Sequence, residues 1–516
     1  MEPMPLLPHR RDVLGGALAA AWLSPALAAP ASSGIALGPP RPFSFEALKA
    51  QAQALAREPH APRPVADADV LQSIDYDAYG QIAFRPEMTL WNGAAGAQPV
   101  RLFALGRYFK EPVAIHVLAG GQAREALYSI DIFQTPAGHP LRRLTRGGFA
   151  GFRLMDGAKP SDWMAFLGAS YFRAAEPFDQ YGASARGLAL NSGGPAPEEF
   201  PRFSTFWLEQ DGHGGLNVYA LLEGPSVAGA FRIGNRRGPG GAVQEIETAL
   251  YFRQPVETLG LAPLTSMFWY GENTPGPRQD WRPEVHDSDG LSLWTGAGER
   301  IWRPLTDPPR VITNAFADDG PKGFGLIQRD RVFEDYQDDS VFYEKRPSLW
   351  VEPVSGWGKG SVRLVELPTT DETNDNIVAF WTPAAKVEAG SVVEARYRLH
   401  WEAADPAASN AARVVSTRVG AGGRPGQTVR AGTRKYVVDF EGPALEGLTR
   451  ASMVEAVVSA SRGRIDEVAA YPVVGTRRWR MMFELSGLDS QPADLRAYLK
   501  RGSQTLSETW LYQAFA

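Results

Sequence analysis

Short runs of β-branched and aromatic residues recur along most of the chain. Examples are residues 113–117, 203–208, 218–222 and 246–252. Gly, Pro, Asn and Asp separate such runs about every 8 to 15 residues. This rhythm is typical of an all-β sandwich or barrel, and it does not fit alternating strands and helices. We therefore predict an all-β fold, built as a sandwich or a barrel.

One stretch has helical spacing instead. Phe45, Leu48, Ala52 and Leu55 would lie on one face of a helix, and Ser44 stands where a capping side chain is expected. We predict a helix that begins after Ser44.

The last part of the chain repeats the strand rhythm at a smaller scale. About seven runs in roughly 130 residues suit an immunoglobulin-like sandwich. These runs are residues 392–401, 414–419, 436–440, 454–459, 479–484, 495–499 and 507–512. We place the domain border near residues 381–385, which predicts domains at 43–385 and 386–516.

The first residues read as an export signal. Arg10 and Arg11 precede an uncharged apolar run, residues 13–27, which ends on a small-residue cleavage site at 26–28. The paired arginines favour the twin-arginine (Tat) route. We expect residues 1–28 to be a signal peptide, residues 29–42 to be a flexible lead-in, and the mature chain to lie in the periplasm without stable membrane insertion.

Composition narrows the class of partner and of chemistry. The chain has no cysteine, which excludes disulfides, and a formal net charge of −5, which does not favour nucleic acid. The seven histidines show no metal-ligand spacing, and neither a nucleophile elbow nor a phosphate-binding loop is present. We expect no metal and no cofactor. Carboxylates remain as the candidate catalytic groups.

Two segments concentrate carboxylates beside aromatic residues. In the first, residues 282–290, His286, Asp287 and Asp289 lie close to Trp281. Crowded like charges separate pKa values and can supply an acid and a base, but such a segment is also a common turn, and residues alone slightly favour the turn.

The second segment, residues 371–376, contains Glu372 and Asp375 and enters an apolar run. We expect that run to hold Asp375 in place, although a solvated turn is the plain alternative. A third stretch with Tyr343, Arg346 and Trp350 mixes rings and cations, as a sugar groove or an ion-paired strand surface would.

Several longer motifs resemble the periplasmic glucan biosynthesis proteins OpgG and OpgD (also MdoG and MdoD). The resemblance runs from about Phe43 to the C-terminus, and the leader favours the OpgD branch. The motifs are residues 166–174, 181–187, 262–267, 282–291, 323–331 and 375–381. The resemblance implies a large N-terminal β-sandwich of the galactose-mutarotase-like type, followed by the immunoglobulin-like domain. It also implies a β-1,2-linked glucan as substrate.

The resemblance also implies roles for individual residues. Asp287 matches a general base and Asp375 a general acid, while Glu372 and Tyr343 match positions that organise substrate or water. We add Arg346, Trp350, His286, Asp289 and Trp281 as expected glucan-binding residues.

The resulting hypothesis is an inverting enzyme that cleaves or transglycosylates β-1,2-glucan, with ring closure as one form of transfer. The rival is a non-catalytic glucan-binding factor that serves a membrane glucosyltransferase in backbone synthesis or branching. Epimerisation, suggested by the fold alone, is weak because fold does not fix function.

Overall fold

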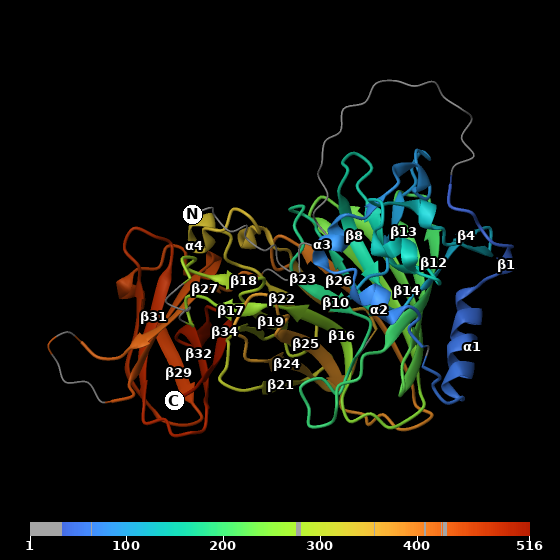
Figure 1. Cartoon of the computed structure of the whole chain (residues 1–516). Coiled ribbons are helices and arrows are strands. Elements are labelled where there is room, and N and C mark those ends of the chain that lie inside the picture. The colour runs from blue at the N-terminus through green and yellow to red at the C-terminus, as the bar shows by residue number, and fades with distance from the viewer. Residues whose placement is uncertain are drawn as a thin grey trace. The chain divides into compact units, whose positions relative to one another are not determined.

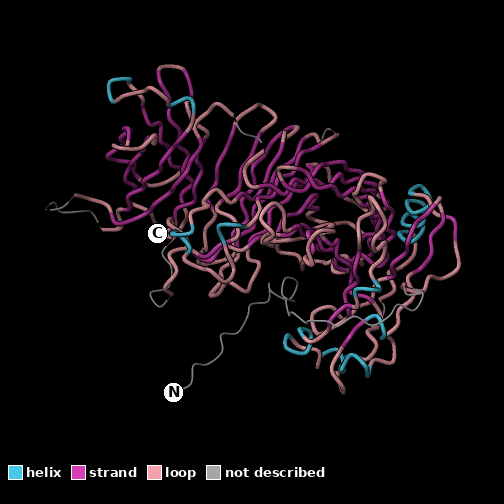
Figure 2. Tube along the Cα trace, turned by 90° about the horizontal axis from the view of Figure 1, so that it is seen from above, coloured by secondary structure: helices cyan, strands magenta, loops and turns pink. Residues whose placement is uncertain are grey.

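The computed structural model describes residues 34–62, 64–274, 280–355, 357–406, 409–424, 426 and 431–516. Strands dominate the regular structure (Figure 2), which confirms the all-β fold class. The predicted signal peptide and residues 29–33 of the predicted lead-in lie outside the described residues. Within them, no helix is long and apolar enough to cross a membrane.

The predicted helix is confirmed as α1 (Phe45–Ala56). The Ser44 hydroxyl accepts a hydrogen bond from the Ala47 N–H at 3.1 Å, which satisfies a backbone donor that a helix start leaves open. Leu48 and Ala52 are buried, and they pack against Tyr219 and other side chains of the neighbouring sheet.

The other helices are short. They are α2 (Ala68–Gln72), α3 (Tyr76–Gly80), α4 (Phe333–Tyr336) and the 3-10 helices η2 (Pro86–Met88), η3 (Ile130–Ile132), η4 (Pro140–Arg143), η5 (Tyr343–Lys345), η6 (Pro443–Leu445) and η7 (Arg450–Ser452).

The chain forms two compact units, labelled by element in Figure 1. The first comprises the described residues up to Pro263 together with Phe380–Trp401; the second comprises Leu264–Ala379 and Glu402–Ala516. The division into domains 43–385 and 386–516 stays a prediction.

Two sheets build the first unit. One has the order β1-β5-β4-β12-β13-β14-β15-β26, and the other β16-β10-β9-β8-β7-β3, with β11 beside β16; β2 and β6 form a separate pair. The strands are β1 (Arg41–Pro42), β2 (Ala83–Phe84), β3 (Val100–Ala104), β4 (Ala114–Ala119), β5 (Gln122–Glu125), β6 (Phe133–Gln134), β7 (Phe149–Met155), β8 (Asp162–Leu167), β9 (Tyr171–Ala174), β10 (Ser184–Arg186), β11 (Ala189–Leu190), β12 (Arg202–Gln210), β13 (Leu216–Glu223), β14 (Val227–Gly238), β15 (Gly241–Phe252), β16 (Leu259–Ser266) and β26 (Val392–Glu402).

Aromatic side chains fill the space between these two sheets. Phe206 of β12 lies edge-on to Phe152 of β7, with ring centroids 5.1 Å apart, and Phe152 stacks on Phe166 of β8 at 4.9 Å. All three are fully buried. Facing sheets with such a shared core form a β-sandwich.

The predicted lead-in is paired where the structure describes it, which corrects the expectation of flexibility for residues 37–42. Arg41 pairs with Ala123 of β5, and the Gly38 N–H donates to the Glu125 carbonyl at 2.8 Å. This segment adds an edge strand to the sheet.

The second unit carries the candidate acidic segments. Its strand orders are β23-β22-β19-β20-β34-β32-β29, β27-β28-β31-β30, β21-β24 and β17-β18, with β33 on β32. The strands are β17 (Phe268–Tyr270), β18 (Val285–His286), β19 (Gly290–Trp294), β20 (Arg300–Pro304), β21 (Ile312–Asp319), β22 (Gly323–Ile327), β23 (Ser348–Pro353), β24 (Lys359–Glu366), β27 (Arg413–Ala421), β28 (Arg434–Glu441), β29 (Glu455–Ala460), β30 (Arg464–Pro472), β31 (Trp479–Ser486), β32 (Ala493–Arg501), β33 (Gln504–Thr505) and β34 (Thr509–Ala514). In sequence, β16 runs from the first unit into the second, and β25 (Ile377–Pro383) runs from the second unit into the first.

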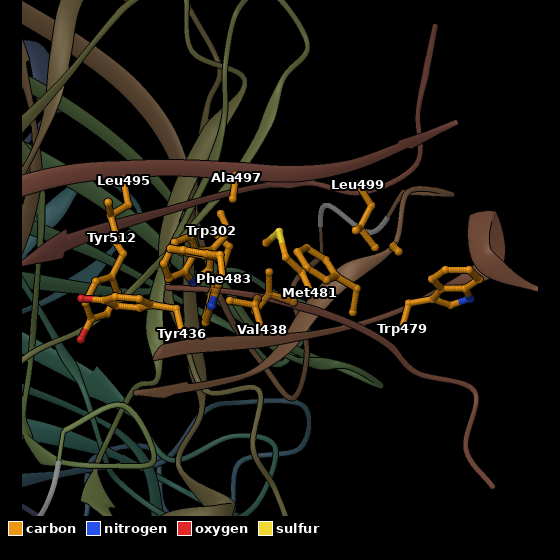
Figure 3. Packing of buried hydrophobic residues seen from close by; sticks show 14 of the residues in the cluster. Trp302, Tyr436, Val438, Trp479, Met481, Phe483, Leu495, Ala497, Leu499 and Tyr512 are labelled. Carbon is orange, nitrogen blue, oxygen red and sulfur yellow. The ribbon is translucent and has the colours of Figure 1, made fainter. Parts of the chain in front are cut away.

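The C-terminal sandwich is held by one apolar cluster (Figure 3). Tyr436 of β28 and Phe483 of β31 stack with centroids 5.1 Å apart, and they face Trp510 and Tyr512 of β34. Leu495 of β32 packs into the same cluster. Alternate residues of both sheets thus point inward, as in other β-sandwiches.

Two strands differ from the sequence prediction of this sandwich. Residues 392–401 form β26, which pairs with β15 and not with the sandwich strands. The sandwich instead contains β30, a strand that was not predicted. The register of β30 against β31 shifts between Asp466 and Ala469, and Glu467 has a positive φ of 53° there. Such a bulge interrupts the two-residue alternation by which a strand is recognised in sequence.

Removal of the Phe483 ring tests this core. We expect Phe483→Ala to lower the free energy of unfolding by about 3–5 kcal/mol, because it leaves a cavity in the stacked cluster. Urea denaturation followed by tryptophan fluorescence measures the change. Met453, which is 75% exposed, supplies the control: Met453→Ala should change stability by less than about 0.5 kcal/mol. Equal effects of the two substitutions would contradict the assigned core.

Candidate functional site

Asp287 follows the short strand β18. Phe268 of β17 pairs with His286 of β18, and the Asp287 N–H donates to the Met267 carbonyl at 2.9 Å. The Asp287 side chain is 0% exposed. The strand pairing therefore fixes a carboxylate inside the protein.

The second acidic segment binds the same stretch of backbone. The Asn376 side chain accepts from the Phe268 N–H at 2.9 Å and donates to the Phe268 carbonyl at 2.8 Å, so its amide imitates a neighbouring strand. Asn376 is buried, whereas Asp375 before it is exposed. The residue that the structure holds in place is therefore Asn376, next to Asp375, and not Asp375 itself. Met267 and Phe268 bring the segments of Asp287 and Asp375 together.

Arg282 connects several carboxylates. Its Nη1 donates to Glu372 at 2.6 Å and to Asp338 at 3.0 Å, and its Nη2 donates to Asp280 at 2.9 Å. Burial opposes ionisation of Asp280, but the hydrogen bonds from Arg282 outweigh it and lower the Asp280 pKa to about 2. Glu372 also accepts a hydrogen bond from the Tyr343 hydroxyl.

Arg346 joins this group to Asp287. Its guanidinium carbon lies 5.3 Å from the centroid of the Tyr343 ring, and its Nε lies 3.8 Å from Asp287 Oδ1. Arg346 is 4% exposed. A buried cation beside a buried carboxylate offsets part of the cost of removing both from water. Glu372, Tyr343, Arg346 and Asp287 therefore form one continuous group.

His286 lies in a separate buried cluster. Its Nε2 is 2.9 Å from Glu284 Oε2 and 3.6 Å from Asp289 Oδ1, and its Nδ1 is 3.2 Å from Gln328 Oε1. Burial lowers the His286 pKa, but the hydrogen bond to Glu284 and the charge of Asp289 raise it further, to about 9. The ring is also stacked on Phe268, with centroids 5.3 Å apart.

Glu284, His286 and Asp289 are close enough together to hold a metal ion. The Gln328 amide nitrogen donates to the Tyr343 carbonyl at 3.1 Å, so its oxygen faces the His286 ring as an acceptor. Both ring nitrogens then act as donors, which describes an imidazolium rather than a metal ligand.

The remaining predicted residues lie in different surroundings. Trp281 is 68% exposed beside Arg282, as a ring that stacks on a sugar would be. Trp350 is 3% exposed and lies in the core. Its indole packs over Gly323, where an added Cβ would come within 2.3 Å of the ring. The structure therefore places Trp350 in the core and not on a glucan-binding surface.

Asp289 accepts hydrogen bonds from the backbone N–H groups of Arg329 and Asp330.

Comparison with known proteins identifies the family. The family model described as "Periplasmic glucan biosynthesis protein, MdoG" matches residues 43–514. The chain belongs to this family of periplasmic glucan biosynthesis proteins.

Named relatives of the MdoG family are similar over nearly the whole chain. Glucans biosynthesis protein D 2 of Ralstonia nicotianae is 48% identical, covering 97% of this chain and 95% of its own. Glucans biosynthesis protein D of Xanthomonas campestris pv. campestris is 47% identical, covering 95% and 93%. The resemblance to the D branch is thereby confirmed.

Among solved structures, a galactose mutarotase related enzyme from Lactobacillus acidophilus matches 49% of this chain and 95% of its own. The sequence identity is 9% and the TM-score 0.21. The fold class of this MdoG-family chain rests on its own strands.

The sequence prediction did not single out Arg282, Asp338 or Gln328. Arg282 stands inside the first acidic segment, so a search for a cation among its carboxylates could have found it. Asp338 and Gln328 carry no local signal, since their partners lie 56 and 42 residues away in sequence.

His286 should make stability depend on pH. Its pKa is raised in the folded state to about 9 from the ordinary 6.5, so the stability it contributes is complete below pH 6.5 and is lost as the pH rises through about 9. We expect the difference in unfolding free energy between wild type and His286→Asn to shrink over that range. Chemical denaturation at a series of pH values measures it.

The matched control for this series is His213→Asn, at an exposed histidine of a turn. A wild-type advantage over His286→Asn that stays constant or grows with pH would contradict the buried imidazolium.

Proposed function

We propose that the chain is a periplasmic enzyme of osmoregulated periplasmic glucan biosynthesis that cleaves or transglycosylates β-1,2-glucan with anomeric inversion. One observation carries the proposal: the segments of Asp287 and Asp375 bind the adjacent residues Met267 and Phe268, and one carboxylate is buried while the other is exposed. Inversion needs two carboxyl groups in different states on opposite sides of the sugar ring.

Asp375 is the proposed general acid. Its exposure lets a glucan chain approach the carboxyl group. Its proton passes to the glycosidic oxygen as the bond from that oxygen to the anomeric carbon breaks. The leaving chain departs with a new hydroxyl group.

Asp287 is the proposed general base. Arg346 Nε lies 3.8 Å from its Oδ1, and the carboxylate takes the proton of the attacking water, directly or through intervening water. The water oxygen bonds to the anomeric carbon from the face opposite the leaving group. A sugar hydroxyl in place of water gives transglycosylation, and a hydroxyl of the same chain gives a ring.

Glu372 and Tyr343 are proposed to position the glucan and the attacking water. Arg282 and the Tyr343 hydroxyl hold Glu372, and the Tyr343 ring lies against Arg346. Movement of Tyr343 would therefore disturb Glu372 directly and Asp287 through Arg346. The proposed partners are β-1,2-glucan and a membrane glucosyltransferase. The twin-arginine leader is the proposed route to the periplasm.

Substitution of the two carboxylates tests the reaction. We expect Asp287→Asn and Asp375→Asn each to lower the turnover of linear β-1,2-glucan by about 10²–10⁴-fold, the usual contribution of a positioned acid or base. Mass spectrometry of the products measures shortening, transfer and cyclisation.

Asp339→Asn is the matched control, because Asp339 is exposed next to Asp338 of the Arg282 cluster. Full activity of this control with loss in the two variants supports the pair. Glucan binding without turnover by the wild-type protein would instead support the non-catalytic binding factor.

Trp281 tests the path of the glucan. We expect Trp281→Ala to raise KM about 3- to 10-fold with little change in kcat, because loss of one stacked aromatic ring costs about 0.5–1.5 kcal/mol. Steady-state kinetics separate the two constants. Phe200→Ala removes a similarly exposed ring, 63% exposed, from the first unit, and should leave KM unchanged. An unchanged KM in Trp281→Ala would place the glucan elsewhere.

A further inference from the structure

A groove of about 620 Å³ lies in the second unit, apart from the residues of the acidic site. Its lining includes Asn273, Asp307, Thr433, Tyr436, Tyr512 and Gln513. This volume lies within the range of about 300–1,000 Å³ that is typical of small-molecule sites. The groove is therefore large enough to accept an organic ligand.

Three lining side chains have polar atoms that are buried without a hydrogen-bond partner among the described residues. They are the Tyr436 hydroxyl, the Thr433 hydroxyl and the Gln513 side-chain oxygen. Tyr436 is 0% exposed and Gln513 is 9% exposed. Buried polar groups are almost always hydrogen-bonded, and each one left open costs about 1–3 kcal/mol. Three in one groove indicate that something else bonds to them.

The hydrogen-bonding capacity of these atoms defines the missing partner. The Gln513 amide nitrogen already donates to Asn314 Oδ1 at 3.3 Å and to Asp494 Oδ1 at 3.0 Å, so its oxygen is left to accept. The Tyr436 and Thr433 hydroxyls can each donate or accept. Hydroxyl groups, which both donate and accept, have the hydrogen-bonding capacity to pair with each of the three.

The hydroxyl groups of two aromatic residues, Tyr436 and Tyr512, lie at one end of the core. Tyr436 and Tyr512 lie edge to face with centroids 5.7 Å apart, and Figure 3 shows both hydroxyl groups at the same end of the cluster. Among the groove's lining side chains, Asp307 and Arg434 carry opposite charges. The open hydrogen-bonding atoms, and not the net charge of the lining, therefore define the ligand.

We propose that this groove is a second binding site, which takes a neutral saccharide through its hydroxyl groups. Its identification as a β-1,2-glucan segment rests on the proposed function, whereas the site itself does not. A second contact on the same chain would raise the effective concentration of a long glucan at the acidic site.

Nuclear magnetic resonance on the Asp375→Asn variant, which prevents turnover, tests the site. Sophorose, the β-1,2-linked glucose disaccharide, and a linear β-1,2-glucan oligosaccharide are titrated separately while the methyl signals of Val419 and Ala421 in the groove are followed. We expect both ligands to shift these signals in a saturable way. We expect Tyr436→Phe combined with Gln513→Met to weaken that binding about tenfold or more, since two hydrogen bonds are lost.

Tyr498→Phe, on β32 outside the groove lining, is the matched control and should bind as the parent does. Absence of shifts at saturating sophorose and glucan would overturn the proposal, as would equal binding by the double variant or equal affinity for glycerol. Turnover by the wild-type protein without shifts in the groove rejects this site alone. Shifts in the groove without turnover by the wild type reject the proposed reaction alone.

Discussion

Hydrogen bonds to two consecutive residues, Met267 and Phe268, position both acidic segments. The Met267 carbonyl accepts from the Asp287 N–H, and the Asn376 side-chain amide binds both the N–H and the carbonyl of Phe268. Backbone donors and acceptors inside a protein must be paired, so these contacts are obligatory as well as directional. A shift of β17 would move both carboxylates at once, which makes this short strand the geometric basis of the site.

Buried charge constrains the rest of the site. Asp287 and Arg346 are both almost fully buried, and Glu372 and Arg282 lie in a second pairing that Tyr343 links to the first. Removing one member of a buried pair leaves the other without compensation, which costs about 3–5 kcal/mol. The group therefore keeps a defined arrangement in the absence of substrate, and a preorganised site needs little rearrangement when charge develops during a reaction.

The local part of this structure could be predicted from the sequence, and the long-range part could not. Ser44 marked the start of α1 by capping chemistry that needs only neighbouring residues. The strand rhythm likewise gave the all-β class. The place of Trp350 in the core depends on glycines of another strand, and the pairing of β26 depends on β15, neither of which has a local signal. The residues of the acidic site were named through family resemblance, while its link through Arg282 emerged only when distant segments were brought together.

The configuration of the first product tests the proposed reaction most directly. Proton nuclear magnetic resonance of linear β-1,2-glucan, recorded immediately after enzyme is added, shows the anomer that is released before mutarotation mixes the two forms. The proposed pair of Asp287 and Asp375, one activating water and one protonating the leaving oxygen, predicts that the α anomer is formed first. Initial formation of the β anomer would contradict an inverting pair and would require one carboxylate to act as a nucleophile.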